Sequence, residues 1–193
     1  KKRIKNTLQI TAKEAVEKLL SGNKQYIDSK CGVGDTSKEK RRLTTLHGQS
    51  PYAIIVTCSD SRVIPEHIFS AGIGELFVIR LAGNVIDDHQ LGSIEYAAGH
   101  LGCRLILVMG HTHCGAVDAA MNGNPENYIK FITDEIRLAI GDETDAAKAC
   151  ERNVAHSIRI IEESLKIHHM EEDTGLRVMG AIYDIESGEV RFL

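Results

Sequence analysis

The chain has 193 residues, a formal net charge of −4 at pH 7 and 26% charged residues. This length suits one sizeable core, and the modest charge gives no reason to expect a nucleic-acid partner. No apolar stretch is long enough to span a bilayer and no signal-peptide hydrophobic region is present, so we expect no membrane partner.

The first expected element is a helix. Thr11-Ala12-Lys13-Glu14 is a capping-box pattern, and the helix that it opens should bury three apolar residues, Val16, Leu19 and Leu20. Because no sheet partner for this helix is obvious nearby, we expect it to pack across a second subunit. The segment that follows, to about Leu46, is polar, and its basic run 38–42 is typical of a solvated helix face.

Strands and helices alternate through the rest of the chain. We expect strands at 52–57, 75–80, 105–110, 176–183 and 190–193, and helices at 65–69, at 88–101, in a segment ending at 121 and at 147–165, where apolar residues recur at steps of three and four. This alternation indicates an α/β fold with a mostly parallel central sheet of four strands, an antiparallel C-terminal edge strand and flanking helices. We expect a single domain over 1–193, with an N-terminal helical arm at 1–48 and an α/β core at 49–193.

Two polar clusters directly follow buried strands. Cys58-Ser59-Asp60-Ser61-Arg62 follows the strand at 52–57, and His111-Thr112-His113-Cys114-Gly115 follows the strand at 105–110. If both strands belong to one parallel sheet, both clusters lie at its carboxyl edge. Open α/β sheets place their functional sites outside that edge.

The clusters contain donors that zinc prefers. Cys58, His111 and Cys114 offer two sulfurs and one imidazole, and they leave a fourth position for water, substrate or Asp60, which is typical of a catalytic zinc site. At the start of a helix, the three-residue spacing of His111 and Cys114 puts both side chains on one face, so we favour His111 over His113, which we expect near the rim or in a hydrogen bond. The alternative is that both cysteines are small buried hydrophobes and His111 a core residue. Two such clusters behind two strands favour the metal.

In these two clusters the chain resembles the β-class carbonic anhydrases, zinc enzymes that interconvert carbon dioxide and bicarbonate. Their signatures, Cys-x-Asp-x-Arg and His-x-x-Cys, are both present, and segments 74–80, 82–84 and 92–97 also look like family segments. The resemblance runs from near Thr11 to the final strand. It implies reversible hydration of carbon dioxide through a zinc-bound hydroxide, one Zn²⁺ per chain, and a homodimer or dimer of dimers with the site at the subunit interface.

Charge counting gives Asp60 and Arg62 catalytic roles. Zinc bound by two thiolates and a neutral imidazole carries no net charge, so it acidifies a bound water less than a three-histidine site does. Asp60 can accept the hydroxyl hydrogen and orient a lone pair toward the carbon, or in a closed form it can occupy the fourth zinc position itself. A bidentate pair with Arg62 keeps the carboxylate ionised and off the metal. The alternative for Asp60 is a helix cap.

Substrate contacts follow from the resemblance alone. It implies that Gln49 donates a hydrogen bond to the substrate oxygen, that the backbone N–H of Gly115 helps, and that Phe77 and Tyr96 line an apolar slot for carbon dioxide. The alternatives are two ordinary core aromatics and a loop glutamine. The chain has no Trp, and relatives with a non-catalytic bicarbonate pocket carry one where this chain has Ile55, so we expect an open zinc site at neutral pH.

Three further cysteines are present in the sequence. Cys31, Cys103 and Cys150 form an odd remainder, which argues against a disulfide framework and suits a cytoplasmic location. The chain begins at Lys1 without a methionine, so a removed leader or a trimmed chain stays open.

The rival functions are a carbon disulfide hydrolase with the same motifs, a non-catalytic zinc protein closed by Asp60, and a phosphatase or redox enzyme using Cys58. Arg62 opposes the second, and the lack of Cys-x-x-Cys opposes the third.

Overall fold

A five-stranded sheet forms the centre of the protein. The computed structural model describes residues 10–28 and 34–193, and the sheet has the order β2-β1-β3-β4-β5. The strands are β1 (Ala53–Thr57), β2 (Leu76–Arg80), β3 (Leu105–His111), β4 (Arg177–Tyr183) and β5 (Val190–Phe192). The first four strands pair in parallel, and β5 pairs antiparallel with β4. The expected sheet is therefore confirmed.

The strand sequences reflect their places in the sheet. Every residue of β1 and of β3 is buried. Interior strands of a parallel sheet are covered on both faces, so they have continuous apolar sequences instead of alternating ones. At the edge of the sheet, β2 has only one buried residue, Ile79.

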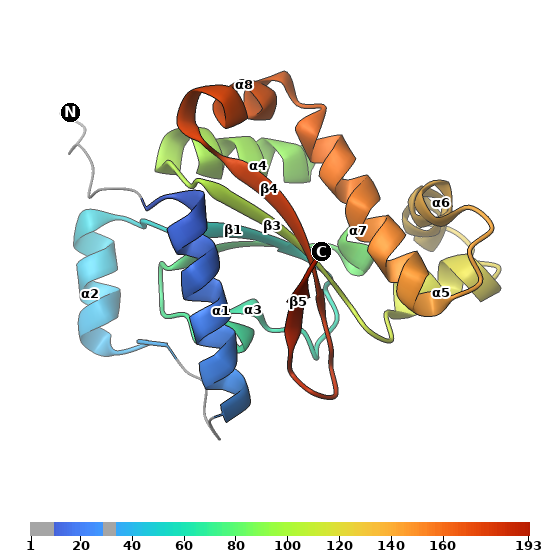
Figure 1. Ribbon diagram of the computed structural model, residues 1–193, viewed down its shortest axis with the longest axis horizontal. Coiled ribbons are helices and arrows are strands. Elements are labelled where there is room, and N and C mark those ends of the chain that lie inside the picture. The colour runs from blue at the N-terminus through green and yellow to red at the C-terminus, as the bar shows by residue number, and fades with distance from the viewer. Residues whose placement is uncertain (1–9, 29–33) are drawn as a thin grey trace.

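Helices cover both faces of the sheet, giving three layers (Figure 1). One face packs against α1 and α3, and the other against α4 to α8. The described helices are α1 (Ala12–Asp28), α2 (Lys38–His47), α3 (Pro65–Ile68), the 3₁₀ turn η1 (Ala82–Asn84), α4 (Asp88–Leu101), α5 (Gly115–Asn122), α6 (Ile129–Ile140), α7 (Ala146–Glu162) and α8 (Leu165–Thr174).

The first helix packs against the sheet of its own chain, so the expectation that it lacks a sheet partner there is wrong. Its capping box is present, because Glu14 accepts hydrogen bonds from the backbone N–H and hydroxyl of Thr11. Leu19 is fully buried, whereas Leu20, expected in the core, is 46% exposed. Asn23 ties α1 to the β4–β5 turn by donating to the Gly188 carbonyl.

Two C-terminal helical regions differ from the expected ones. The predicted helix at 147–165 ends at Glu162, because Ser164 caps a new helix, α8, by accepting a hydrogen bond from the Ile167 N–H. Leu165 is therefore not on the buried face and is 74% exposed. Helix α6 was not predicted at all, although it packs on the core through Ile136.

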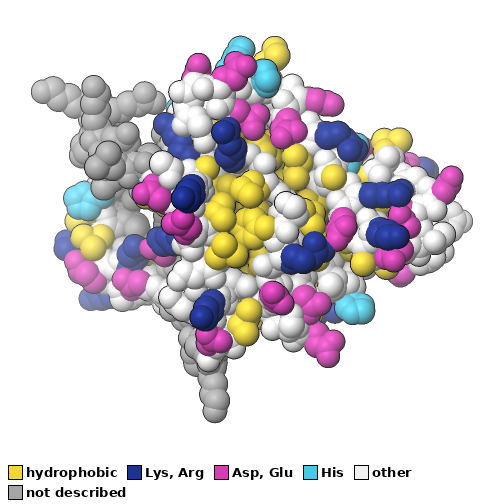
Figure 2. Space-filling model, viewed as in Figure 1, with side chains coloured by type: hydrophobic (Ala, Val, Ile, Leu, Met, Phe, Trp, Pro, Cys, Tyr) yellow, Lys and Arg dark blue, Asp and Glu magenta, His cyan; other side chains and the backbone are white. Residues whose placement is uncertain are grey.

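The outer edge of the sheet carries exposed apolar side chains. Among the described residues, β5 pairs with only the last three residues of β4. Figure 2 shows apolar side chains gathered in the middle of the molecular face in view, between α1 and α7. Met179 is partly buried and Leu193 is 50% exposed. Within the described ranges, no helix has both the length and the apolar character needed to cross a membrane.

Candidate metal centre and active site

Two neighbouring strands bring the two polar clusters together. β1 and β3 pair in parallel, with Thr57 opposite Met109, so Cys58 and His111 both lie at the carboxyl edge of the sheet. β3 continues for two residues beyond this pair, and His111 is its last residue. The sequence gap between the clusters therefore closes through the sheet.

The side chains of Cys58, His111 and Cys114 form a compact, buried group. Their ligand atoms all lie within 4.8 Å of one another, and the three residues are at most 5% exposed. Donors around one zinc ion lie roughly 3.5–3.8 Å apart, given the usual bond lengths. Over the described residues, this is the one group of three or more His, Cys, Asp and Glu that could hold a metal ion.

The two ring nitrogens of His111 have different surroundings. Its Nδ1 lies 2.8 Å from the Thr112 carbonyl oxygen, to which only a protonated nitrogen can donate. Its Nε2 is buried and has no hydrogen-bond partner, although buried polar atoms nearly always have one. A metal ion would satisfy this lone pair, and a carbonyl on the other ring nitrogen is the usual support of a metal-binding histidine. The residues therefore fit zinc.

The helix-face argument for His111 and Cys114 is wrong in its geometry. His111 ends β3 and Cys114 is the N-cap of α5, so no helical turn joins them. Instead the chain reverses at His113, which has a left-handed φ of 55°. The His113 side chain is exposed and lies outside the cluster. A strand end, a tight turn and a helix start bring the two ligands together.

The two thiols are electrostatically coupled. A hydrogen bond with Cys114 lowers the pKa of Cys58 to about 4; burial opposes this shift, and the His111 ring and the Gly83 N–H add to it. The same hydrogen bond and burial raise the pKa of Cys114. A divalent cation binds both sulfurs as thiolates, so metal binding would release whatever protons the pair holds without it.

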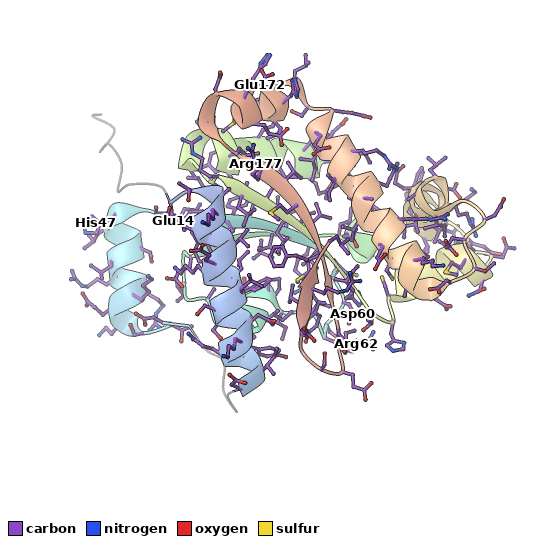
Figure 3. The ribbon with its side chains drawn as sticks, viewed as in Figure 1. Glu14, His47, Asp60, Arg62, Glu172 and Arg177 are labelled. Carbon is purple, nitrogen blue, oxygen red and sulfur yellow. The ribbon has the colours of Figure 1, made fainter. Side chains whose placement is uncertain are left out.

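Asp60 and Arg62 form a bidentate pair beside this group. The Arg62 Nε donates to Asp60 Oδ1 at 2.9 Å and its Nη2 to Oδ2 at 2.7 Å, and Figure 3 shows the two residues together. These hydrogen bonds hold the pKa of Asp60 well below its usual range, although partial burial opposes them. Asp60 Oδ2 lies 4.0 Å from His111 Nε2, so an ionised carboxylate borders the site without belonging to the ligand group.

Two residues that the sequence reasoning missed hold the Cys58–Asp60 segment, one through its backbone and one through the Cys58 sulfur. Arg80, at the end of β2, donates to the Cys58 carbonyl at 3.1 Å and to the Asp60 carbonyl at 2.7 Å. The Gly83 N–H donates to Cys58 Sγ at 3.2 Å. The sequence offered one signal for Arg80, its place as the last residue of the strand predicted at 75–80. The structure pairs it with Thr57, the residue before Cys58.

The expected substrate residues are not all brought to the metal group of the same chain. Gly115 opens α5 next to Cys114, and a Cβ there would have no neighbour within 4 Å. Gln49 is exposed and precedes β1, so it lies toward the opposite end of that strand from Cys58. Phe77 lies three residues before the end of β2, and its ring is 6.3 Å from that of Tyr96, which is 47% exposed.

A cavity reaches the centre from the side of Cys114. It has a volume of about 760 Å³, and Cys114 and Gly115 line it together with residues from the start of α7 and from the β4–β5 turn. Three donors that converge beside an ionised carboxylate, with room next to one of them, define a catalytic zinc site in an α/β protein.

Comparisons with known proteins agree. A family model described as carbonic anhydrase matches residues 53–190. Carbonic anhydrase 2 of Mycobacterium tuberculosis is 33% identical over 191 residues, covering 91% of this chain and 86% of that protein. The crystal structure of the β-carbonic anhydrase CafA of Aspergillus fumigatus is 28% identical, with a TM-score of 0.70 over 81% of this chain and 82% of that one. Tetrameric β-carbonic anhydrases of Sordaria macrospora share the fold, with a TM-score of 0.75 at 24% identity, over 81% and 87% of the chains.

The family model covers well over half of the chain, and the matched region includes Cys58, His111 and Cys114. The chain belongs to the carbonic anhydrase family and, within it, to the β class.

Proposed function

We propose that this protein catalyses the zinc-dependent, reversible hydration of carbon dioxide to bicarbonate and a proton. The observation that carries the proposal is the convergence of Cys58, His111 and Cys114 within 4.8 Å, with an ionised Asp60 beside them. The three residues would hold one zinc ion per chain. When bound, zinc supplies the Lewis acidity that makes water a nucleophile, less strongly here than at a three-histidine site because two thiolates cancel its charge.

Asp60 supplies a hydrogen-bond acceptor that orients the attacking oxygen, and Arg62 holds that acceptor in place. Because Asp60 is ionised, its carboxylate accepts the hydrogen of the attacking oxygen and directs the lone pair toward the carbon. Arg62 holds both carboxylate oxygens, and its Nη2 also donates to the His113 carbonyl at 3.1 Å. This bond ties the orientation of the carboxylate to the turn that carries His111 and Cys114.

The Asp60–Arg62 pair also weighs against two rival functions. A closed, non-catalytic zinc protein needs Asp60 among the ligands, whereas both of its oxygens are engaged by Arg62. A phosphatase with Cys58 as nucleophile needs a guanidinium free to bind a phosphate, and that of Arg62 is bound to a carboxylate instead.

One assay tests the function directly. Zinc analysis should give about one ion per chain, as a single three-ligand site requires. Stopped-flow hydration of carbon dioxide should be fast, should rise toward alkaline pH, and should be lost on removal of zinc with a chelator and restored by zinc. A zinc-loaded protein without hydration activity would refute the proposed reaction.

We further propose that the protein works as a dimer or a dimer of dimers. Helix α2 has no buried residue, and Leu46 on it is 62% exposed. Gln49 and the Phe77–Tyr96 pair lie away from the metal group of their own chain, so a second copy is needed if they are to line its substrate site. The apolar edge at β4 and β5 offers surface for a further contact (Figure 2).

Mixing two inactive variants tests the shared site. Cys114→Ala removes a ligand and Gln49→Ala removes a proposed substrate contact from the neighbouring site. In a mixed dimer one of the two sites is intact, so denaturing and refolding the two variants together should restore part of the activity that neither has alone. Monomers by light scattering, or no recovery in proven mixed dimers, would contradict the proposal.

We also propose a reducing location such as the cytoplasm. Cys58, Cys103, Cys114 and Cys150 are free and buried, and the proposed zinc site needs both of its cysteines as thiolates. Fractionation of the source cells with an antibody, compared with marker enzymes, tests this location; recovery outside the reducing compartments would contradict it.

A further inference from the structure

The turn η1 presents a hydrogen-bond donor to one of the two sulfurs. The N–H of Gly83 points at Cys58 Sγ over 3.2 Å, and both residues are buried. Gly83 has a left-handed φ of 64°, and a Cβ on it would lie 2.7 Å from Ile136 Cδ1 and 3.0 Å from Ala116 Cβ. The conformation and the close packing together require glycine here. The direction of its N–H is thus set by how the turn is held.

Helix α7 holds this turn from the other side. The Asn153 Nδ2 donates to the Gly83 carbonyl at 2.7 Å, and Asn153 is 1% exposed. One helical turn later, Ser157 donates to the Asn84 carbonyl at 3.0 Å. Two successive carbonyls of the turn are therefore fixed by one helix that lies 70 residues further along the chain.

Asn153 is a poor choice for stability alone. Its Oδ1 is buried and has no hydrogen-bond partner. An unpaired buried polar atom costs about 1–3 kcal/mol, and a leucine of similar shape would avoid that cost. The Asn153 amide therefore donates one hydrogen bond, to the Gly83 carbonyl, while its Oδ1 carries the cost of an unpaired buried atom.

We infer that Asn153 is a positioning residue for the metal centre: it holds Gly83 so that the Gly83 N–H donates to Cys58 Sγ. A hydrogen bond to a thiolate withdraws negative charge from the sulfur and fixes its orientation, which matters most in a site with two thiolates. The inference rests on the proposed zinc site but concerns how tightly and in what electronic state that site holds its metal.

Removing the amide tests this role. In Asn153→Leu the shape is kept and the donor is lost, so zinc affinity, measured by competition with a chromogenic chelator, should fall about 10- to 100-fold, as for other residues that support metal ligands. In the Co²⁺-substituted protein, the sulfur-to-metal charge-transfer band should move to lower energy, because a sulfur that has lost a hydrogen bond gives up charge more easily. Asn153→Ala, which creates space instead of filling it, should shift the band in the same direction and serves if the leucine variant does not fold.

Ser157→Ala is a graded comparison. It lies on the same helix and is equally buried; its hydroxyl lies within hydrogen-bond distance of the Asn84 carbonyl and of the Asn153 carbonyl, so it supports the turn without bonding to Gly83 itself. Its charge-transfer band should move less than in the Asn153 variants, and its zinc affinity should fall by less than about threefold, below the range for residues that support ligands directly. An unmoved band in both folded Asn153 variants, or an equal shift in Ser157→Ala, would overturn the inference. Failure of the proposed function is distinguishable, because it would remove the zinc or the hydration activity of the unaltered protein.

Discussion

The two segments that carry the metal ligands are held in place in different ways. The Cys58–Arg62 segment depends on groups from other elements: Arg80 of β2 holds two of its carbonyls, and Gly83 of η1 donates to its sulfur. The turn from His111 to Cys114 is also bonded to other elements, because Arg62 donates to the His113 carbonyl and the Thr112 N–H donates to the Tyr183 carbonyl. Its sharp reversal, however, comes from its own backbone, since one ligand ends β3, the other is the N-cap of α5, and the left-handed His113 joins them.

This difference separates two kinds of sensitivity. The geometry around Cys58 can be lost through a substitution twenty or more residues away, because its supports are long-range hydrogen bonds. The reversal at His113 is set locally, so it should tolerate changes of the exposed His113 side chain.

Loss of a ligand should be equally severe on both segments. Cys58→Ala and Cys114→Ala each leave two donors, which cannot retain zinc against a chelator, so zinc content should fall from about one ion per chain to below about a tenth. Metal analysis of the purified variants measures this. Unchanged zinc in either variant would move the ligand assignment elsewhere.

Asp60 should separate metal binding from turnover. Asp60→Asn keeps the shape but replaces an ionised hydrogen-bond acceptor by a neutral amide, so zinc should stay bound while the attacking oxygen loses its orientation and turnover falls by about 10²-fold, as expected when a reacting group is misplaced. Stopped-flow rates normalised to zinc content check this. Full turnover in zinc-loaded Asp60→Asn would remove its assigned role.

Arg80 should show the remote dependence of the Cys58 segment. Arg80→Met keeps the aliphatic stem and removes the donors to the Cys58 and Asp60 carbonyls, so zinc affinity should fall about tenfold. Arg177→Met is the control, because Arg177 starts β4 toward the opposite end of the molecule from Asp60 (Figure 3). Equal zinc affinities of the two variants by chelator competition would contradict the remote support.

Two residues with positive φ sharpen the contrast between the segments. Gly83→Ala places a Cβ against Ile136, so the zinc-loaded protein should lose about 1–3 kcal/mol of unfolding free energy. His113→Gly relieves the left-handed strain of an exposed residue at some entropic cost, so its stability should change by less than about 1 kcal/mol and its zinc content should not change. Urea unfolding and metal analysis compare them. Substantial zinc loss in His113→Gly would show that the second turn is not self-supporting.

The smallest effect concerns Glu75, just before β2 and far from the ligands along that strand. Burial raises the pKa of Glu75, but the Gly72 N–H and Lys18 outweigh it, so the net pKa is lowered. A lowered pKa adds stability above the ordinary carboxyl range, and this stability is lost as the pH falls through the folded-state value. Glu75→Gln should therefore cost about 0.5–1 kcal/mol at pH 7 and progressively less as the pH falls below the ordinary carboxyl range, by urea unfolding across that range. A cost that is independent of pH would contradict the charge-based account.

Much of the fold was predictable because it is encoded in local patterns. The strands β1 and β3 are continuous apolar runs, and α1 opens with a capping box, so sequence alone located them. Helix α6 was missed, although Ile129, Ile132, Ile136 and Ile140 recur at helical spacing. The break between α7 and α8 was missed because the apolar pattern continues through Ile161 to Leu165, across the N-cap residue Ser164.

The sequence by itself determined the ligand types, their order along the chain and their place behind two strands, because donor chemistry and strand patterns are properties of short segments. How they meet depends on the tertiary structure. Arg80 and Asn153 donate to backbone carbonyls, and Gly83 donates to the Cys58 sulfur; these bonds join residues up to 70 positions apart, so they leave no local pattern. Gln49 lies toward the opposite end of β1 from Cys58, so the substrate contacts expected of Gln49, Phe77 and Tyr96 stay predictions.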